Sequence, residues 1–141
     1  MPTYPLPHVT VDWLKERTVG ALAGHMGLEP VEVSEGKLVA RMEIKPHHTA
    51  PNGYLHAASV IALADTACGF GTLAHMPEHG KNFTTIELKS NHVGTATEGA
   101  IRAVATARHL GGMTHVWDAE VTRESDGKTI ALFRCTQMIL K

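Results

Sequence analysis

The sequence predicts an α+β fold in which one strongly curved antiparallel sheet wraps around a single buried helix. Three observations lead to this prediction. The segment 55–76 is long and apolar and holds one charged residue, Asp65. About six strand-like runs flank it, and short glycine-bearing connections join several of them, as in hairpins. A helix that is apolar on nearly all sides must be covered, and a curved sheet covers it.

Composition supports one globular domain over residues 1–141. The chain is 43% apolar and 19% charged, which is typical of folded rather than disordered proteins. Lys and Arg number 13 against 14 Asp and Glu, a net charge of -1. A nearly neutral chain has no bulk attraction for phosphate backbones or anionic membranes, so we expect neither nucleic acid nor a membrane as partner. A local basic patch can still hold one phosphorylated ligand.

Residues 1–20 are predicted to form an arm and a short helix. Residues 1–7 contain three prolines and are expected to be extended. A helix is expected over 11–19, capped by Thr10 or Asp12, and three glycines within 20–27 are expected to break it.

We expect a cytoplasmic protein without bound metal. The N-terminus lacks the basic and apolar regions of a secretory signal, and Cys68 and Cys135 lie in apolar stretches, as reduced core thiols do. The ten histidines are scattered and none has HExxH spacing, so no metal site is predicted.

The strand-like runs alternate apolar and polar residues. Two precede the apolar segment, at 29–34 and 37–44, with a tight turn at Glu35-Gly36 between them. Four follow it, at 83–93, 100–109, 113–123 and 129–140. Neighbours joined by short glycine-bearing turns are expected to be antiparallel.

The apolar segment is predicted to be a buried central helix that ends near 69–73. Polar residues such as His56, Ser59 and His75 make it a poor membrane span. Asp65 lies in its most apolar part and is a candidate general base or nucleophile, because burying a charge is costly unless it is compensated. The alternative is a carboxylate satisfied by a hydroxyl such as Thr66 or by strand backbone.

Helix geometry separates the two chemical groups of this segment. His56 and Asp65 are nine residues apart, which is about 13.5 Å along a helix and opposite faces. If both act together, the site lies between subunits and the protein is an obligate dimer. Free N–H groups at the helix N-terminus, Ala57 among them, can hold an oxyanion while Asp65 attacks a carbonyl or activates water. His56 either orients this loop or only caps and packs the helix.

The motif Asn52-Gly53, His56-Ala57-Ala58 and Asp65-Thr66 resembles the hotdog-fold acyl-CoA thioesterases of the PaaI-like and 4-hydroxybenzoyl-CoA types. The resemblance runs from about 22 to 141 and includes the run 85–92. It implies a hotdog fold, homodimers with a continuous sheet, and often a homotetramer built as a dimer of dimers. It also implies hydrolysis of an acyl-CoA to the free acid and coenzyme A without metal or organic cofactor, coenzyme A being part of the substrate.

The resemblance assigns roles residue by residue. Asp65 matches the catalytic carboxylate, His56 the motif histidine, and Ala57 the glycine whose N–H faces the thioester carbonyl. Asn52 falls in the loop near the acyl carbonyl. Two departures are visible: alanines replace two glycines after His56, and Gly69 stands where some relatives position water with Ser or Thr, a role left to Thr66 or another residue.

The phosphates of coenzyme A are expected to be bound by cations and N–H groups at the subunit surface. The expected binding residues are those of the glycine-rich hairpin and of the strand after the helix: Arg108, His109, Gly111, Lys89, Ser90 and Asn91. Arg108 and Lys89 are alternatively plain solvated charges at strand ends. Tyr54 is a candidate for the acyl pocket.

Two other functions stay open at this stage. A hotdog-fold hydratase or dehydratase would carry an Asp and His pair in another motif. A non-catalytic acyl-CoA binding module would keep the fold and the cationic rim but would not need Asp65. The sequence leaves the acyl group, aryl or medium-chain, undetermined.

Overall fold

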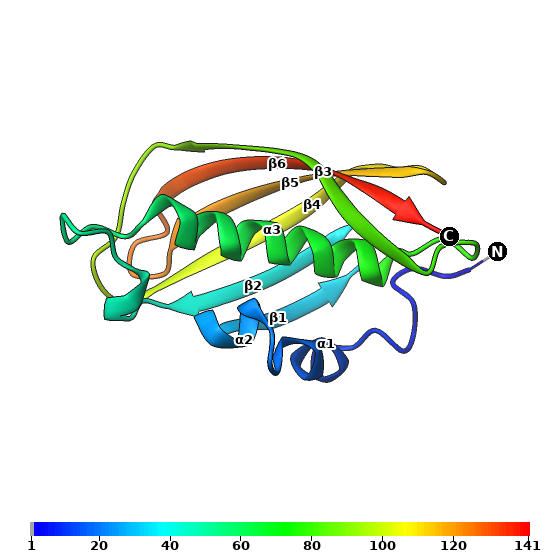
Figure 1. Ribbon diagram of the computed structural model, residues 1–141, viewed down its shortest axis with the longest axis horizontal. Coiled ribbons are helices and arrows are strands. Elements are labelled where there is room, and N and C mark those ends of the chain that lie inside the picture. The colour runs from blue at the N-terminus through cyan, green and yellow to red at the C-terminus, as the bar shows by residue number, and fades with distance from the viewer. Residues whose placement is uncertain (1) are drawn as a thin grey trace.

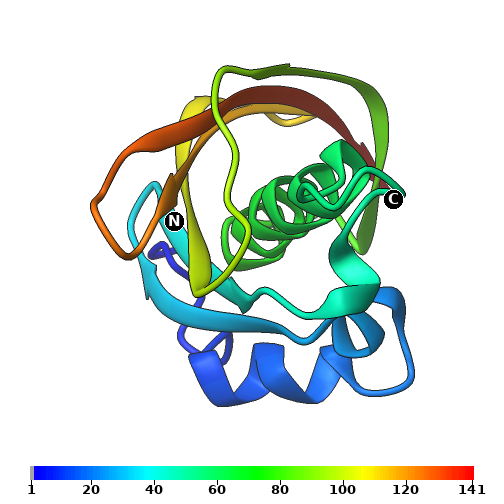
Figure 2. The ribbon, with the colours of Figure 1, turned by 90° about the vertical axis from the view of Figure 1, so that its left-hand side faces the viewer.

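One sheet curls around one long helix in the computed structural model, which describes residues 2–141 (Figure 1). The helix α3 (Ala57–Ala74) lies inside the curl, and a view along its axis shows the sheet passing around most of it (Figure 2). The predicted α+β architecture, a curved antiparallel sheet around a central helix, is confirmed.

The sheet has six strands, and every neighbouring pair is antiparallel. Its order is β1-β2-β4-β5-β6-β3. The strands are β1 (Leu28–Ser34), β2 (Lys37–Glu43), β3 (Asn82–His92), β4 (Ala100–Leu110), β5 (Thr114–Arg123) and β6 (Thr129–Leu140). Their ends lie close to the predicted ones, because apolar and polar residues alternate along them. The strand order places β3 at the sheet edge, paired with β6 and far from β2.

The N-terminal region differs from its prediction in one respect. Helix α1 (Val11–Thr18) forms as expected, and the Thr10 side chain accepts a hydrogen bond from the backbone N–H of Trp13 at 3.1 Å. The segment 20–27, however, contains a second short helix, α2 (Leu22–Met26). Both short helices pack beside β1 (Figure 2).

The glycines of this segment delimit α2 rather than break it. Gly20 and Gly27 both have φ of 75°, a conformation that favours glycine, and they lie just outside the two helix ends. Gly24 is inside the helix because the chain packs closely there. A Cβ at Gly24 would lie 2.2 Å from the carbonyl oxygen of Thr18.

Helix α3 extends to Ala74, slightly beyond its predicted end, and most of its residues are buried. It is long and apolar enough to cross a membrane, but it forms the core of this fold. One stripe of this largely buried helix remains open in the single chain. It consists of residues spaced three or four apart on one face: Ala58, Ile61, Ala62, Asp65 and Thr66. We call these residues the open stripe.

Candidate active site

The N-terminus of α3 is capped by a histidine and exposed to solvent. His56 is the N-cap, and its Nδ1 accepts a hydrogen bond from the backbone N–H of Ala58 at 2.9 Å. The proton of the neutral ring is then on Nε2, and the residue is exposed. Within residues 2–141, no acceptor lies within hydrogen-bond distance of the Ala57 N–H. The helix therefore offers a free backbone donor at its positive end.

Some polar groups of the loop before α3 form hydrogen bonds within the loop. The side-chain oxygen of Asn52 accepts from the backbone N–H of Tyr54 at 3.1 Å, and Gly53 has φ of 88° in the same turn. Tyr54 is 54% exposed at the loop tip. The amide nitrogen of Asn52 is the part of that side chain left for a ligand.

Asp65 lies in the middle of α3 on the open stripe. Its Oδ1 is buried, and no hydrogen-bond partner for it exists among residues 2–141. The alternative of a carboxylate satisfied by Thr66 or strand backbone therefore does not describe this oxygen. Burial raises the pKa of Asp65, and the nearby Thr85 hydroxyl, which donates its hydrogen bond to Oε1 of Gln137 at 2.7 Å, opposes the rise only in part. An under-compensated carboxylate of this kind is typical of functional sites.

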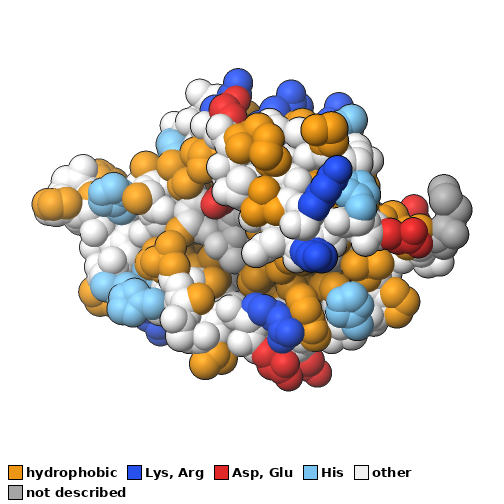
Figure 3. Space-filling view, turned by 45° about the vertical axis from the view of Figure 1, so that its right-hand side comes forward, with side chains coloured by type: hydrophobic (Ala, Val, Ile, Leu, Met, Phe, Trp, Pro, Cys, Tyr) orange, Lys and Arg blue, Asp and Glu red, His pale blue; other side chains and the backbone are white. Residues whose placement is uncertain are grey.

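The structure does not bring Asp65 and the helix N-terminus together within one chain. Ala57 and Asp65 are eight residues apart on the same straight element, about 12 Å along its axis. Next to Asp65 is the sheet edge β3, which pairs with β6 and with no other strand of the described chain. Ile86 and Leu88 of β3 are 52% and 41% exposed. The side of the molecule with α3 and β3 carries many apolar side chains (Figure 3).

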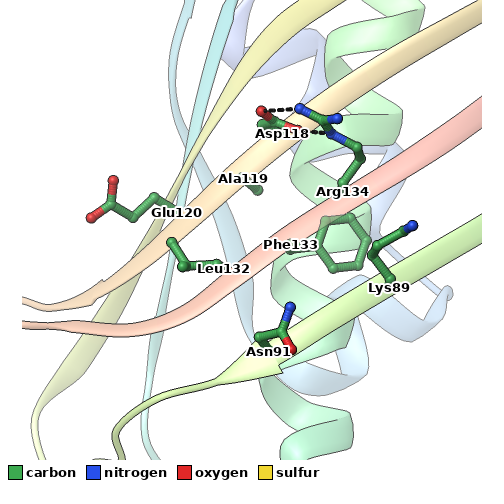
Figure 4. Close-up of a pocket in the computed structure, with 8 residues that line it drawn as sticks. All are labelled: Lys89, Asn91, Asp118, Ala119, Glu120, Leu132, Phe133 and Arg134. Atoms are coloured by element: carbon green, nitrogen blue, oxygen red, sulfur yellow. Dashed lines mark hydrogen bonds and ion pairs between the residues drawn. The ribbon is translucent and has the colours of Figure 1, made fainter.

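The predicted coenzyme A residues divide between the two faces of the sheet. Lys89 and Asn91 line a pocket of about 440 Å³ on the outer face, with α3 behind the sheet (Figure 4). Ser90, between them, faces inward opposite Phe133 in the strand register, and its hydroxyl is buried with no partner in residues 2–141. Strand alternation explains the division, because successive side chains point to opposite faces.

Arg108 reaches the same outer face through an ion pair. Its Nε lies 3.7 Å from Oδ2 of Asp118, which also lines the pocket. Arg134 Nη2 donates to the same carboxylate oxygen at 2.9 Å, and this pairing holds the pKa of Asp118 below its ordinary value. Sequence analysis missed Asp118 and Arg134. The signal was the alternation of β5 and β6, which places both charges on the outer face.

The hairpin between β4 and β5 holds His109 and Gly111. The backbone N–H of Gly111 donates to the Thr114 carbonyl at 2.9 Å, so this N–H closes the turn. A Cβ at Gly111 would lie 2.6 Å from Nε2 of His109, which shows how closely the ring packs on the turn. No cluster of three or more metal-ligating side chains is present in residues 2–141.

We compared the sequence and the fold with those of known proteins. The family described as the thioesterase superfamily matches residues 52–130. A 1,4-dihydroxy-2-naphthoyl-CoA hydrolase of Listeria monocytogenes is 33% identical over 116 residues, which cover 82% of this chain and 93% of the relative. The chain belongs to the thioesterase superfamily. It is a thioester hydrolase of the acyl-CoA type with the hotdog fold, as the sequence motif predicts.

Solved structures of thioesterases share its architecture. A variant of thioesterase PA1618 from Pseudomonas aeruginosa superposes with a TM-score of 0.88 at 25% identity, covering 93% of this chain and 94% of the other. Thioesterase HI1161 from Haemophilus influenzae superposes with a TM-score of 0.87 at 26% identity, covering 98% and 94%. The thioesterase likeness thus extends over nearly all of the chain.

Proposed function

We propose that this thioesterase hydrolyses an aryl- or medium-chain acyl-CoA to the free acid and coenzyme A. The site would combine Asp65 of one subunit with the helix N-terminus of another. The observation that carries the proposal is the buried Oδ1 of Asp65, which has no partner in residues 2–141 and lies on the open stripe beside a free sheet edge.

The chemistry needs a polarised carbonyl and an activated nucleophile. The Ala57 N–H, free at the positive end of α3, would donate to the thioester oxygen, and Nε2–H of His56 is a second donor nearby. Asp65 would either attack the carbonyl carbon itself or take a proton from the attacking water. The carbon–sulfur bond then breaks, and the coenzyme A sulfur leaves and takes up a proton, which on the general-base route is the one that Asp65 took from water. On the nucleophilic route the acyl group stays on Asp65 as a mixed anhydride, and a water molecule hydrolyses it to release the free acid. These groups supply the whole scheme without metal or organic cofactor.

A homodimer would complete the site. If β3 of one copy paired with β3 of a second copy, the unpaired backbone groups of both β3 strands would form hydrogen bonds, and the two sheets would become one continuous sheet. The same contact would cover the exposed side chains of Ile86 and Leu88 and the open stripe. Two such dimers would form a dimer of dimers. Sedimentation that showed a fully active monomer would contradict this assembly.

Coenzyme A would lie along the outer-face cations. Lys89 supplies positive charge in the pocket that Asn91 lines, Arg108 supplies it on the other side of Asp118, and His109 and Gly111 belong to the hairpin at the end of the same sheet. Ser90 faces inward, so we propose it for the acyl side with Tyr54 and Thr66. The names of the relatives favour an aryl group, since two of them are 1,4-dihydroxy-2-naphthoyl-CoA hydrolases.

One assay separates this proposal from a binding module or a hydratase. Wild type and Asp65→Asn are compared on a panel of aryl- and alkyl-CoA substrates, with release of free coenzyme A thiol as the readout. We expect turnover by wild type on at least one aryl or medium-chain substrate. Binding without thiol release by wild type would favour the non-catalytic module, and hydration of an enoyl-CoA without thiol release would favour the hydratase.

A further inference from the structure

We infer that His48 is a positioning residue for the helix N-terminus that polarises the thioester. It is the last residue of a short 3-10 helix, η1 (Pro46–His48), between β2 and α3, and is only 1% exposed. The inference rests on the proposed function, because it concerns the same donor, the Ala57 N–H. His48 itself is too deeply buried to touch a substrate.

Both ring nitrogens of His48 are used. Nδ1 accepts a hydrogen bond from the backbone N–H of Lys45 at 2.9 Å. Nε2 pairs at 2.8 Å with the carbonyl oxygen of Met26, the last residue of α2. A backbone N–H can only donate and a carbonyl can only accept, so the ring must be neutral with its proton on Nε2. The ring thus connects the start of the loop to α2.

The backbone of His48 connects the same residue to α3. Its carbonyl oxygen accepts from the backbone N–H of His56 at 3.0 Å and from the Ser59 hydroxyl at 2.8 Å. His56 is the N-cap, and Ser59 lies in the first turn of the helix. One residue therefore joins α2, the loop and the helix start. The position of the Ala57 N–H depends on that junction.

A misplaced donor should affect the reaction more than substrate binding. A displacement of about 1 Å at a reacting centre can cost about 10²-fold in rate. The oxyanion develops only in the transition state, so weakening its donor lowers kcat and leaves KM nearly unchanged. A role limited to stability would instead lower the melting temperature with kcat per folded molecule unchanged.

The other end of α3 offers a matched control. His75 is buried and has the same kind of ring contacts: Nε2 accepts from the Gly36 N–H at 2.8 Å, and Nδ1 pairs with the Gly71 carbonyl at 2.8 Å. It lies at the C-terminus of the helix, away from the proposed donor. His47 is a second control, since its exposed ring lies 4.2 Å from that of His48, centroid to centroid.

The experiment compares His48→Ala, His48→Gln, His75→Gln and His47→Gln as full-length protein. We expect kcat of His48→Ala to fall by about 10- to 100-fold with KM within about twofold of wild type. His48→Gln should recover part of the loss, because its amide nitrogen can replace Nε2 as donor to Met26. His75→Gln should lower the melting temperature and keep kcat within about twofold, and His47→Gln should resemble wild type.

A second readout does not depend on activity. Amide hydrogen exchange at Ala58, Ser59 and Val60, which bond to His56, should accelerate in His48→Ala and not in His75→Gln. Unchanged exchange and kcat in a folded His48→Ala would overturn the inference. A loss of kcat in His75→Gln as large as that in His48→Ala would also overturn it. If wild type hydrolysed no acyl-CoA, the proposed function would fail, while the exchange data would still decide whether His48 positions the helix start.

Discussion

The two ends of α3 are built from similar parts and differ in what they leave unpaired. Each end has a buried histidine whose two ring nitrogens form hydrogen bonds with backbone atoms. This residue is His48 at the N-terminal end and His75 at the C-terminal end. At the finish, the Leu6 N–H donates to the Ala74 carbonyl at 2.8 Å, and Tyr4 stacks on His75. At the N-terminal end, Ala57 is exposed and its N–H has no acceptor in residues 2–141.

This difference indicates where function resides. Unsatisfied groups at a helix end are normally covered by caps, other backbone or ligands. The N-terminal arm covers the C-terminal end of α3 from within the chain. The N-terminal end keeps a free donor at the positive pole of the helix, where an anion or oxyanion is stabilised.

The largest expected effect is at Asp65, between the two ends. Asp65→Asn should lower acyl-CoA turnover by at least about 10²-fold, since one base or nucleophile contributes that much or more. Removing a buried charge should leave the fold intact or stabilise it. Steady-state kinetics and thermal unfolding of the same preparation check both parts. An Asn variant as fast as wild type would make Asp65 structural.

At the start of the helix, the backbone rather than the side chain should matter. Ala57→Gly keeps the N–H and should retain activity within about an order of magnitude. Ala57→Val also keeps the N–H but crowds the carbonyl, and should lose about 10²-fold, more for branched or aryl acyl groups than for small ones. Kinetics on small and bulky acyl-CoA substrates make the comparison. Equal activity of the Val variant on all of them would place the carbonyl elsewhere.

At the finish of the helix, acid should destabilise the protein. His115 of β5 is buried at this end, with its Nδ1 3.3 Å from the Thr72 hydroxyl of α3. Burial lowers the pKa of His115 from 6.5 to about 4, and burial also lowers the pKa of His75. The unfolded chain therefore binds protons more strongly, so stability is full above about pH 6.5 and is lost as pH falls towards 4. For His115 the loss should reach about 3 kcal/mol. Denaturant unfolding from pH 7 to 4 measures it, and His115→Gln should flatten the curve.

The smallest expected effect is on the outer face. Arg108 is exposed and shares Asp118 with Arg134, so its single contribution to binding is limited by solvent screening. Arg108→Ala should raise KM for acyl-CoA by about three- to tenfold with kcat unchanged, and added salt should reduce the difference. An unchanged KM at low salt would make Arg108 an ordinary surface charge.

Local patterns in the sequence predict most elements of this fold but not how they assemble. Alternation fixes the strand ends, and a side-chain cap fixes the start of α1. The edge position of β3 has no local signal, since it depends on which strands pair across the whole chain. Helix α2 was missed because glycines that end a helix resemble glycines that break one.

Some features of the candidate site are likewise predictable from the sequence, and others are not. Asp65 is recognisable as a lone charge in an apolar run, and His56 by its position before the helix. The open stripe is not recognisable, because a surface covered by a second subunit and a surface covered by the sheet are both apolar. Strand alternation puts Asp118 and Arg134 on the outer face but does not show that they pair, and the ring contacts of His48 depend on tertiary geometry alone.

Subunit complementation tests the central claim most directly, namely that Asp65 of one chain acts with the helix N-terminus of another. Asp65→Asn and Ala57→Val, each nearly inactive alone, are co-expressed in equal amounts. In mixed dimers one of the two sites combines intact Asp65 with an intact helix start. Random pairing makes half of the dimers mixed, so activity should return to about one quarter of wild type. Activity no higher than the sum of the separate variants would show that the site lies within one chain.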